Sequence, residues 1–381
     1  MKKVNFLLIL FLVIVSIVVV SFSFWYFKPS KKLNIFILDK TVTDFTYREH
    51  ASFTWVLRNN KIVKSDGTLY RKDQDYYGFV PLKPTDKEKY KIKSIRLFEV
   101  LTLSDQLDMV YYTDSYGVFS SDLADSGVYI KPYLIYGGLN QNDYLLLREM
   151  KRKNKLIITE FNLLGSPTSD LIKQKTQELF DFRWTGWTGR YFKSLQNISK
   201  NHIPGWIINS YQKNYGKKWE FSNPGVVIVN EDGRILVLEE NTSMNTAVPA
   251  IIPTEEARKE YDLPSFQKYG FWFDIIQTSK KNTIQAYFKL DVNDLGHKML
   301  EENGLPVNFP AIIENTKDYK FYYFSGDFSD HQPVGWLANF GGISECMKKI
   351  HTGSNGTNNE FFWNFYVPLL KGILEKNIYK K

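Results

Sequence analysis

The chain has little cysteine and little histidine for its 381 residues. Cys346 is the single cysteine, which excludes an intramolecular disulfide, a cysteine-based zinc site and a CxxC redox pair. The five histidines form no HExxH or similar pattern, which argues against a histidine-based metal centre. No internal repeat or low-complexity segment interrupts the chain. The fold must therefore be stabilised by packing alone, and the aromatic residues, 16% of the chain, supply large side chains for it.

One long stretch carries no charge: residues 6–27, FLLILFLVIVSIVVVSFSFWYF. About 20 apolar residues suffice to cross a bilayer as a helix. The stretch ends in four aromatic residues, which favour a membrane interface, rather than in the small residues of a cleavage site. No cysteine for lipidation lies nearby. We predict an uncleaved transmembrane anchor over residues 1–32 and a single domain over residues 33–381.

The flanking charges decide the orientation only weakly. Lys2 and Lys3 precede the apolar stretch, and Lys28, Lys31 and Lys32 follow it, so the positive-inside count is nearly a tie. The very short amino-terminal flank is typical of a signal-anchor, which would place the main domain outside the cytoplasm. The net charge of +8 is scattered rather than clustered, so we expect attraction to an anionic surface and no nucleic-acid partner. The pattern does not define an oligomeric state.

Short apolar runs alternate with helical patterns in the first half of the predicted domain. Four runs predict strands, and helical patterns follow most of them, beginning near Ala51, Asn142 and Asp170. This alternation predicts βαβ units and an α/β fold, with a flavodoxin-like, mostly parallel sheet flanked by helices. We expect the intervening residues 78–94 to form a polar connection broken by proline. The predicted strands cover residues 33–40, 107–114, 129–138 and 155–160.

The pattern changes after Phe182. Residues 224–241 contain two β-rich runs joined by Asn-Glu-Asp-Gly, a strong hairpin signal. Further strands are predicted over residues 269–278, 283–292 and 320–330, and an aromatic-rich helix with a break or kink at Pro368 is predicted near the carboxyl terminus. We therefore predict one α/β domain whose sheet is extended by antiparallel strands in its carboxyl-terminal half.

Polar residues end each of the four predicted parallel strands. In an open parallel sheet, ligands bind outside the carboxyl ends of the strands, near a switch in strand order. If the strands are adjacent, these residues surround one crevice, which is the predicted ligand site. They are Asp39, Thr113, Asp114, Tyr136, Gly137, Gly138, Glu160 and Asn162.

The arrangement resembles the class I glutamine amidotransferase-like superfold, including its trehalose-utilisation-type relatives. The resemblance covers residues 33–187 and rests on the strand order, on YGG (Tyr136–Gly138) and on TEFNLLGSPTS (residues 159–169). In that superfold a nucleophilic cysteine commonly sits in a tight strand-to-helix elbow, with a histidine and an acid downstream. The corresponding segment here contains no cysteine, and Cys346 lies far downstream. The resemblance therefore implies the fold without thiol amidotransferase chemistry.

Two replacements for the missing thiol can be considered. Ser166 is followed directly by Pro167, without a G-x-S-x-G elbow, so we expect it to help start a helix. Alternatively, Glu160 with Asp114 or Asp39 forms a carboxylate pair, one protonated and one charged, as glycoside hydrolysis requires. In this second hypothesis Glu160 and Asp114 are catalytic.

The stretch RWTGWTGRYF contains two tryptophans, Trp184 and Trp187, and Arg190. Glycines let a loop approach a ligand closely, and flat indoles stack on sugar faces. The competing interpretation is a loop that packs its aromatic residues against the core. Because a buried guanidinium needs a carboxylate partner, we predict that Glu160 points toward the ligand side and contacts Arg190 or another cation.

The stretch SGDFSDHQP ends a predicted aromatic strand with Asp327, Asp330 and His331. This spacing, with Glu49 and His50, could serve a metal, but a turn in which aspartates cap their own backbone is the preferred interpretation. We expect no metal and no cofactor. Asp327 is still a candidate ligand-binding residue, because it follows a strand directly.

The sequence supports two functional hypotheses. The first is a membrane-anchored, extracytoplasmic protein that binds a cell-envelope ligand, plausibly a carbohydrate, without thiol chemistry. The second is a carboxylate-based hydrolase. The ligand class follows from the anchor, the aromatic residues and the carboxylates.

Overall fold

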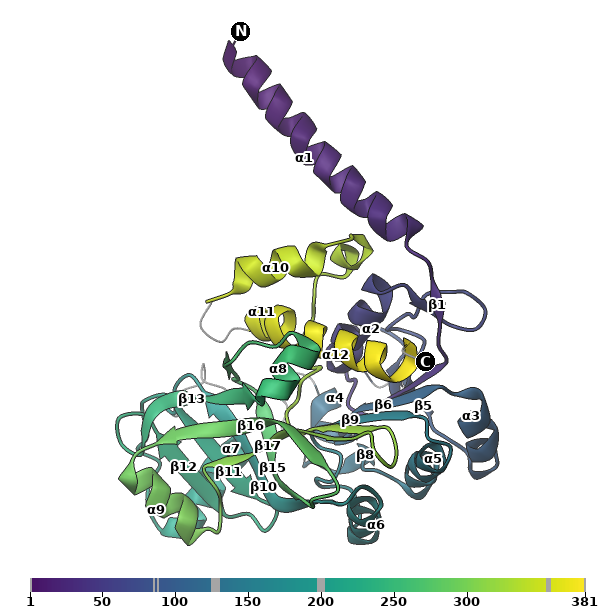
Figure 1. The fold of residues 1–381 in the computed structure, drawn as a ribbon. Helices are drawn as coiled ribbons and strands as arrows, with labels where there is room; N and C mark the ends of the chain where they lie inside the picture. Colours follow the sequence, from purple (N-terminus) through teal and green to yellow (C-terminus); the bar gives the residue numbers. More distant parts are fainter. Residues whose placement is uncertain are drawn as a thin grey trace.

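The computed structural model describes residues 2–84, 86–87, 89–124, 131–196, 203–353 and 358–379. Helix α1 (Lys2–Phe27) projects from the rest of the molecule (Figure 1). Its residues Phe6–Phe27 are long and apolar enough to cross a membrane, a test that a signal sequence also passes. None of the most apolar window of this helix is buried against the protein.

A ten-stranded sheet forms the centre of the molecule. Its middle strands β18, β9, β6 and β2 run parallel to one another, and β4 is parallel to β2. The strands on the β17 side and the edge strand β5 are antiparallel to their neighbours, so the predicted mixed α/β fold is confirmed. The order is β14 (Gln267–Lys268), β13 (Met244–Pro253), β16 (Thr283–Val292), β17 (Asn308–Asn315), β18 (Phe321–Phe324), β9 (Leu156–Glu160), β6 (Met109–Asp114), β2 (Ile35–Asp39), β4 (Tyr77–Pro81) and β5 (Tyr90–Lys93).

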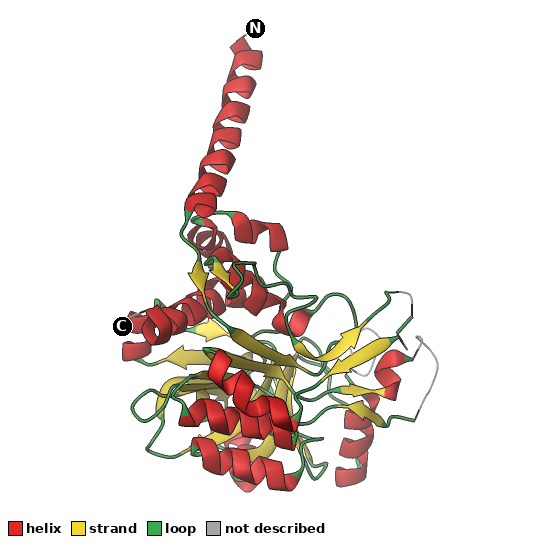
Figure 2. Ribbon diagram, turned by 90° about the vertical axis from the view of Figure 1, so that its right-hand side faces the viewer, coloured by secondary structure: helices red, strands yellow, loops and turns green. Residues whose placement is uncertain are grey.

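Helices cover both faces of the parallel strands (Figure 2). Alternate residues of β2 show why, because side chains of a strand point to opposite faces. Ile35 and Ile37 pack with the buried residues of α2 (Arg48–Asn59) and α12 (Val367–Leu374). Phe36 and Leu38 pack with the other group of helices. That group is α3 (Val100–Gln106), α5 (Gln141–Arg152) and α6 (Asp170–Phe180).

A four-stranded antiparallel sheet extends the core. Its order is β12 (Ile235–Glu239), β11 (Gly225–Asn230), β10 (Phe182–Phe192) and β15 (Trp272–Thr278). Val226 and Ile228 face the same core as α2, whereas Val227 packs against α7 (Gly205–Tyr215). The β11–β12 pair is the hairpin that the sequence predicted.

Two predictions about the large sheet are wrong. Residues 78–94 are not a plain connection, because β4 and β5 form an antiparallel hairpin at the sheet edge. The third predicted strand does not enter the large sheet: β8 (Leu134–Tyr136) pairs antiparallel with β7 (Val118–Phe119) in a small separate sheet. The first two residues of that predicted strand lie outside the described part of the chain.

The carboxyl-terminal helix continues through Pro368. A π-helical turn, Phe362–Tyr366, precedes α12, so the proline falls in the first turn of α12 and needs no backbone donor there. The remaining elements are β1 (Lys31–Lys32), β3 (Ile62–Val63), η1 (Leu97–Glu99), α4 (Ser120–Leu123), α8 (Glu255–Tyr261), α9 (Asp294–Glu302), η2 (Gly335–Asn339), α10 (Ile343–His351), α11 (Asn358–Phe361) and η4 (Glu375–Tyr379).

Candidate functional site

Acidic side chains gather where the parallel strands end. Asp39 at the end of β2 is paired in register with Asp114 at the end of β6. Glu160 at the end of β9 is paired with Phe324, the last residue of β18. The loop after β18, residues 325–331, therefore starts beside Glu160 and carries two further aspartates. All these strands end at the same edge of the sheet, where parallel sheets bind ligands.

The acids of β2 and β6 are engaged inside the protein. Asp39 accepts from the backbone N–H of Thr41 (3.0 Å), and its Oδ2 lies 2.5 Å from His50 Nδ1. The other ring nitrogen of His50, Nε2, lies 2.7 Å from the carbonyl oxygen of Lys72. Asp39 and His50 are both fully buried. Asp39 is therefore satisfied by groups of this chain.

Asp114 lies beside that pair. Its Oδ1 accepts from the backbone N–H of Tyr116 (2.6 Å), and burial raises the pKa of Asp114 to about 8. The neighbouring Thr113 is buried and donates its hydroxyl to the carbonyl of Leu38 (3.1 Å). Asp114 is thus protonated around neutral pH. The hydroxyl of Thr113 links β6 to β2 through its bond to Leu38.

Glu160 holds the loop that follows β18. Its Oε2 accepts from the backbone N–H groups of Phe328 (3.0 Å) and Ser329 (3.2 Å), and its Oε1 contacts the Ser329 hydroxyl. That hydroxyl also lies 2.5 Å from the carbonyl oxygen of Glu49. A serine hydroxyl has one proton, so both contacts are satisfied when Glu160 donates to Ser329 and Ser329 donates to Glu49. Burial raises the pKa of Glu160 to about 8, which agrees with the protonated form.

The predicted contact between Glu160 and Arg190 is wrong. Among the described residues, Glu160 has no ion-pair partner, and its oxygens are occupied by the loop after β18. The guanidinium of Arg190 lies over the rings of Phe192 and Trp272, 5.2 Å from each centroid. Burial lowers the pKa of Arg190, and the nearby Asp330 and Asp327 oppose this effect. Arg190 therefore faces the aspartates of the loop rather than Glu160.

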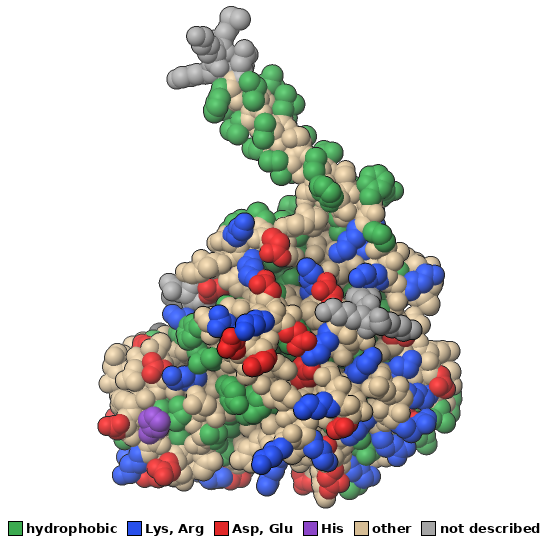
Figure 3. Space-filling model, in the orientation of Figure 1, with side chains coloured by type: hydrophobic (Ala, Val, Ile, Leu, Met, Phe, Trp, Pro, Cys, Tyr) green, Lys and Arg blue, Asp and Glu red, His purple; other side chains and the backbone are tan. Residues whose placement is uncertain are grey.

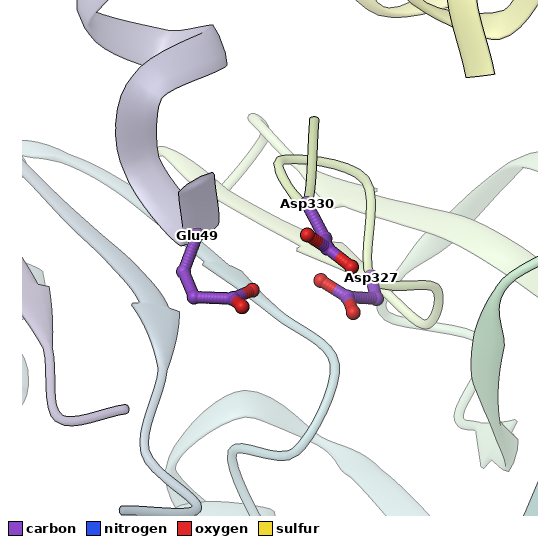
Figure 4. A group of neighbouring side chains, drawn as sticks. All are labelled: Glu49, Asp327 and Asp330. Carbon is purple, nitrogen blue, oxygen red and sulfur yellow. The ribbon is translucent and has the colours of Figure 1, made fainter. Parts of the chain in front are cut away.

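Three carboxyl groups point toward one another in front of this loop (Figure 4). They belong to Glu49 in the first turn of α2 and to Asp327 and Asp330, and their closest oxygens lie within 4.8 Å of one another. We call these three residues the carboxylate cluster. Asp330 binds the guanidinium of Arg48 through both oxygens, with Nη2 to Oδ2 at 2.6 Å. The cluster joins the amino-terminal half of the chain to the loop after β18.

Glu49 and Asp327 differ from the other acids of this edge. Within the described residues, neither carboxyl group has a hydrogen-bond or ion-pair partner, and Asp327 is only 7% exposed. Burial, together with the neighbouring Asp330, raises the pKa of both groups well above the usual range. Asp327 is the costlier of the two to keep, because it is buried and Glu49 is partly exposed, and a buried polar group normally has a partner. Among the described residues, they are the two acids of this site whose carboxyl groups have no partner.

The carboxylate cluster has the donor set of a hard cation. Carboxylate oxygens are the ligands that Ca²⁺ and Mg²⁺ prefer, and Glu49, Asp327 and Asp330 each offer one. The histidines of the metal pattern considered from the sequence lie elsewhere: His50 is paired with Asp39, and the ring of His331 packs on Phe362. The expectation of no metal and no cofactor stays a prediction.

The residues of the small β7–β8 sheet form a separate group. The carbonyl of Gly138 accepts from Lys40 Nζ (2.8 Å), which also lies over the ring of Tyr136. Gly137 packs directly on the backbone of Gly117. Lys40 is buried in an ion pair with Asp143 of α5 (2.5 Å). These contacts fix the loop beside β6, and no contact of Tyr136, Gly137 or Gly138 with the carboxylate cluster occurs among the described residues.

Asn162 and the tryptophans lie away from the carboxylate cluster. Asn162 has a left-handed backbone (φ 66°), and its N–H donates to Asp274 (3.3 Å). The segment that contains Trp184 and Trp187 is strand β10 and not a loop. Trp187 is buried in the core, and the indole of Trp184 donates to the carbonyl of Trp187 (3.0 Å). The packing interpretation therefore fits both indoles better than sugar stacking does.

Sequence reasoning missed Asp274 and Ser329 and left the role of Arg48 open. Asp274 of β15 accepts from Thr188 (2.7 Å) and Tyr323 (3.0 Å), and burial raises its pKa to about 6. The sequence did contain a signal for Asp274, because it is the one charged residue in the apolar run WFDII (residues 272–276). Ser329 gave no signal, because its role depends on Glu160. Arg48 gave only a weak one, as part of YREH, the start of a helix.

Comparisons with known proteins give a loose structural likeness only. No protein-family model matches the chain, and no curated protein matches it. A ThuA-like protein from Bacteroides uniformis superposes with a TM-score of 0.38 and 7% identity, over 92% of this chain and 95% of its own. A ThuA-like protein from Parabacteroides merdae gives 0.36 and 10%, over 77% and 79%. These neighbours agree loosely with the trehalose-utilisation-type resemblance, and at such TM-scores they carry no argument about the site.

Proposed function

We propose that this chain is a membrane-anchored, extracytoplasmic protein that binds a polyhydroxylated ligand of the cell envelope, a carbohydrate, at the carboxylate cluster. The observation that supports it is the pair of unpartnered carboxyl groups, Glu49 and Asp327, at the carboxyl edge of the parallel strands. The remaining acids of this edge already have partners within the chain.

The chemistry of the cluster suits sugar hydroxyls. A carboxylate accepts hydrogen bonds, and a sugar ring supplies several hydroxyl donors on neighbouring carbon atoms. Arg48, whose side chain is 53% exposed, stands beside Asp330 and provides donors for ligand oxygens. Each buried acceptor that gains a donor recovers part of the cost of its burial, about 1–3 kcal/mol. This gain applies to Asp327, which is buried, more than to Glu49, which is partly exposed.

The proposed location is supported by α1. Its apolar residues Phe6–Phe27 are long enough to cross a bilayer, and the aromatic residues at its end favour retention as an anchor rather than cleavage. The lysines that flank the apolar stretch, two before it and three after it, are nearly balanced, so the extracytoplasmic orientation is part of the proposal. A protein that is anchored by α1 with its main domain outside the cytoplasm is exposed to the ligands of the cell envelope.

The carboxylate-based hydrolase remains the second candidate, because Glu160 and Asp114 both have a pKa of about 8 and could serve as acids. It is less well supported. Glu160 is 1% exposed, and both of its oxygens contact the loop after β18. Asp39 is occupied by His50. A general acid must reach its substrate, and Glu160 and Asp114 are both buried, with 1% and 8% of their surface exposed.

The test is a ligand screen with the full-length protein in lipid nanodiscs. Oligosaccharide fractions from cell envelopes are added with EDTA and, separately, with Ca²⁺, and the unfolding free energy is measured. At 100 times its Kd a ligand stabilises by about 2.7 kcal/mol. We expect at least one fraction to stabilise the native protein and the exposed control Glu302→Gln, and not Asp327→Asn.

The outcomes separate the hypotheses. Stabilisation that is equal in native protein and Asp327→Asn, or absent for every fraction, contradicts the proposal. Stabilisation by Ca²⁺ alone would make the cluster a cation site instead. Release of new reducing ends, abolished by Glu160→Gln, would favour the hydrolase.

A further inference from the structure

Helix α1 contacts the rest of the protein before its apolar stretch ends. The backbone N–H of Gly341 donates to the carbonyl of Ser21 (2.9 Å), and the Ser21 hydroxyl donates to the carbonyl of Gly341 (2.8 Å). The rings of Phe22 and Phe340 lie 6.1 Å apart. A Cβ on Gly341 would lie 2.9 Å from Cβ of Phe24. The segment between η2 and α10 is therefore packed directly on α1.

The position of this contact along α1 fixes its depth. Ser21 lies six residues before Phe27, the last residue of the apolar stretch. At 1.5 Å per residue, this is about 9 Å along the helix axis. If the membrane ended before Ser21, only residues 6–20 would remain to cross it. Those 15 residues span about 22 Å, which is less than the roughly 30 Å of a hydrocarbon core.

The surface beside this contact exposes three large apolar side chains, although Ile343 and Met347 of α10 pack against the core. Val334, Trp336 and Ile350 are 50%, 64% and 64% exposed, and no residue of α10 is buried. Figure 1 shows α10 directly below the end of α1, on the side of the molecule from which α1 projects. In Figure 3 apolar side chains cover α1 down to the body of the molecule, where charged side chains lie among the apolar ones. Exposed Trp is typical of a membrane interface.

We infer that η2 and α10 form a second, in-plane membrane contact, at the boundary between lipid headgroups and acyl chains. The inference rests on the proposed anchor, since without a spanning α1 the depth is undefined. Amphipathic helices at this boundary typically bury about 5–10 Å, which matches the depth of Ser21. The outer face of α10 also carries Glu345 and Lys349, which are exposed and belong at a polar boundary.

One consequence is a fixed orientation of the protein. A single helix leaves the attached domain free to tilt, whereas two contacts hold one face of it against the bilayer. In Figure 1 α6 lies at the opposite end of the molecule from α1 and α10. That end would point away from the membrane.

The single cysteine gives the test. Cys346 is exposed on α10, four residues before Ile350 and so on the same side of the helix. A nitroxide is attached to Cys346 of the full-length protein in nanodiscs, and its collisions with oxygen and with a water-soluble nickel complex are compared. The inference predicts an oxygen-to-nickel ratio several times that of a control label at Asp170→Cys in a Cys346→Ser background, because Asp170 is fully exposed on α6.

A third label separates failure of this inference from failure of the anchor. In the Cys346→Ser background, Val13→Cys reports whether the middle of α1 lies in lipid. A lipid-exposed label at residue 13 with a water-exposed label at Cys346 overturns the in-plane contact alone. Water exposure at both positions overturns the anchor and the inference together. Lipid exposure at both supports both.

Discussion

Glu160 and Asp327 are buried carboxyl groups beside the same loop, and they differ in what their oxygens contact. Glu160 has two backbone donors and the Ser329 hydroxyl. Asp327 has no partner among the described residues and faces Glu49 and Asp330. The first arrangement positions the loop, and the second leaves a site that a ligand can complete.

Glu160→Gln tests the positioning role of Glu160. Glutamine reproduces the protonated acid, because its amide can donate to Ser329 while its oxygen accepts from the backbone. The native pKa of about 8 lies above the unfolded value of about 4.3. Between these values the folded state binds more protons, so its stability falls as pH rises, by at most about 1.4 kcal/mol per pH unit for one group. Glutamine does not titrate, so the free energy of unfolding of the variant, relative to that of the native protein, should increase from pH 5 to pH 8.

The measurement is the free energy of unfolding in urea at pH 5, 6.5 and 8. The difference between variant and native protein removes the contributions of Asp114 and Asp274, whose pKa values are also raised. It reports on Glu160 together with its effect on Asp327, whose pKa Glu160 helps to raise. A difference that stays constant with pH would mean that Glu160 is not held protonated. A variant that is less stable at every pH would mean that the charge itself is needed.

The sequence indicated the acids of the strand ends, but not their partners. Asp39, Asp114 and Glu160 were found because strand ends are local features. The partner of Glu160 lies at residues 328–329, about 170 positions away in the chain, and no local pattern connects the two. Arg190 was assigned to Glu160 by charge alone, and the structure stacks it on Phe192 and Trp272 instead.

At the scale of elements, the site depends on one late strand. β18 enters the sheet beside β9 and runs parallel to it, so the loop after it arrives at the edge where β2, β6 and β9 end. The predicted alternation of strands and helices was confirmed because it rests on hydrophobic periodicity. The position of β18 could not be predicted, since strand order depends on contacts between distant segments.

The β4–β5 hairpin was missed because its sequence is rich in lysine and proline, which suit the edge of a sheet. Gly78 allows β4 to pair with β2. Its φ is +135°, and a Cβ there would lie 1.6 Å from the carbonyl oxygen of Asp39. We expect Gly78→Ala to cost more than about 3 kcal/mol, since both backbone strain and a backbone clash are involved.

Gly67→Ala is the matched control for this change. Gly67 also has a positive φ (+85°), but a Cβ there would meet nothing within 4 Å. Strain alone should cost about 1 kcal/mol. Chemical denaturation of both variants gives the comparison, and equal losses would show that the close approach of β4 to β2 is not constrained by Gly78.

At the scale of the whole molecule, helix α1 and the carboxylate cluster are made by distant parts of one chain. α1 is packed on the segment near Gly341, only ten residues beyond the loop that carries Asp327 and Asp330. The amino-terminal apolar stretch was evident from composition alone. Its contact with the rest of the protein could not be, because it depends on the completed fold.

The central claim is that Asp327 is retained for a ligand at a cost in stability. The most direct measurement is the free energy of unfolding of ligand-free Asp327→Asn at pH 8, beside native protein and Glu302→Gln. In the folded native protein the carboxyl group must either take up a proton or remain charged beside Glu49 and Asp330, and asparagine avoids both. We predict a gain of about 1–3 kcal/mol for Asp327→Asn and no change for Glu302→Gln. A loss of stability in Asp327→Asn would show that the carboxylate serves the fold, and would contradict the account.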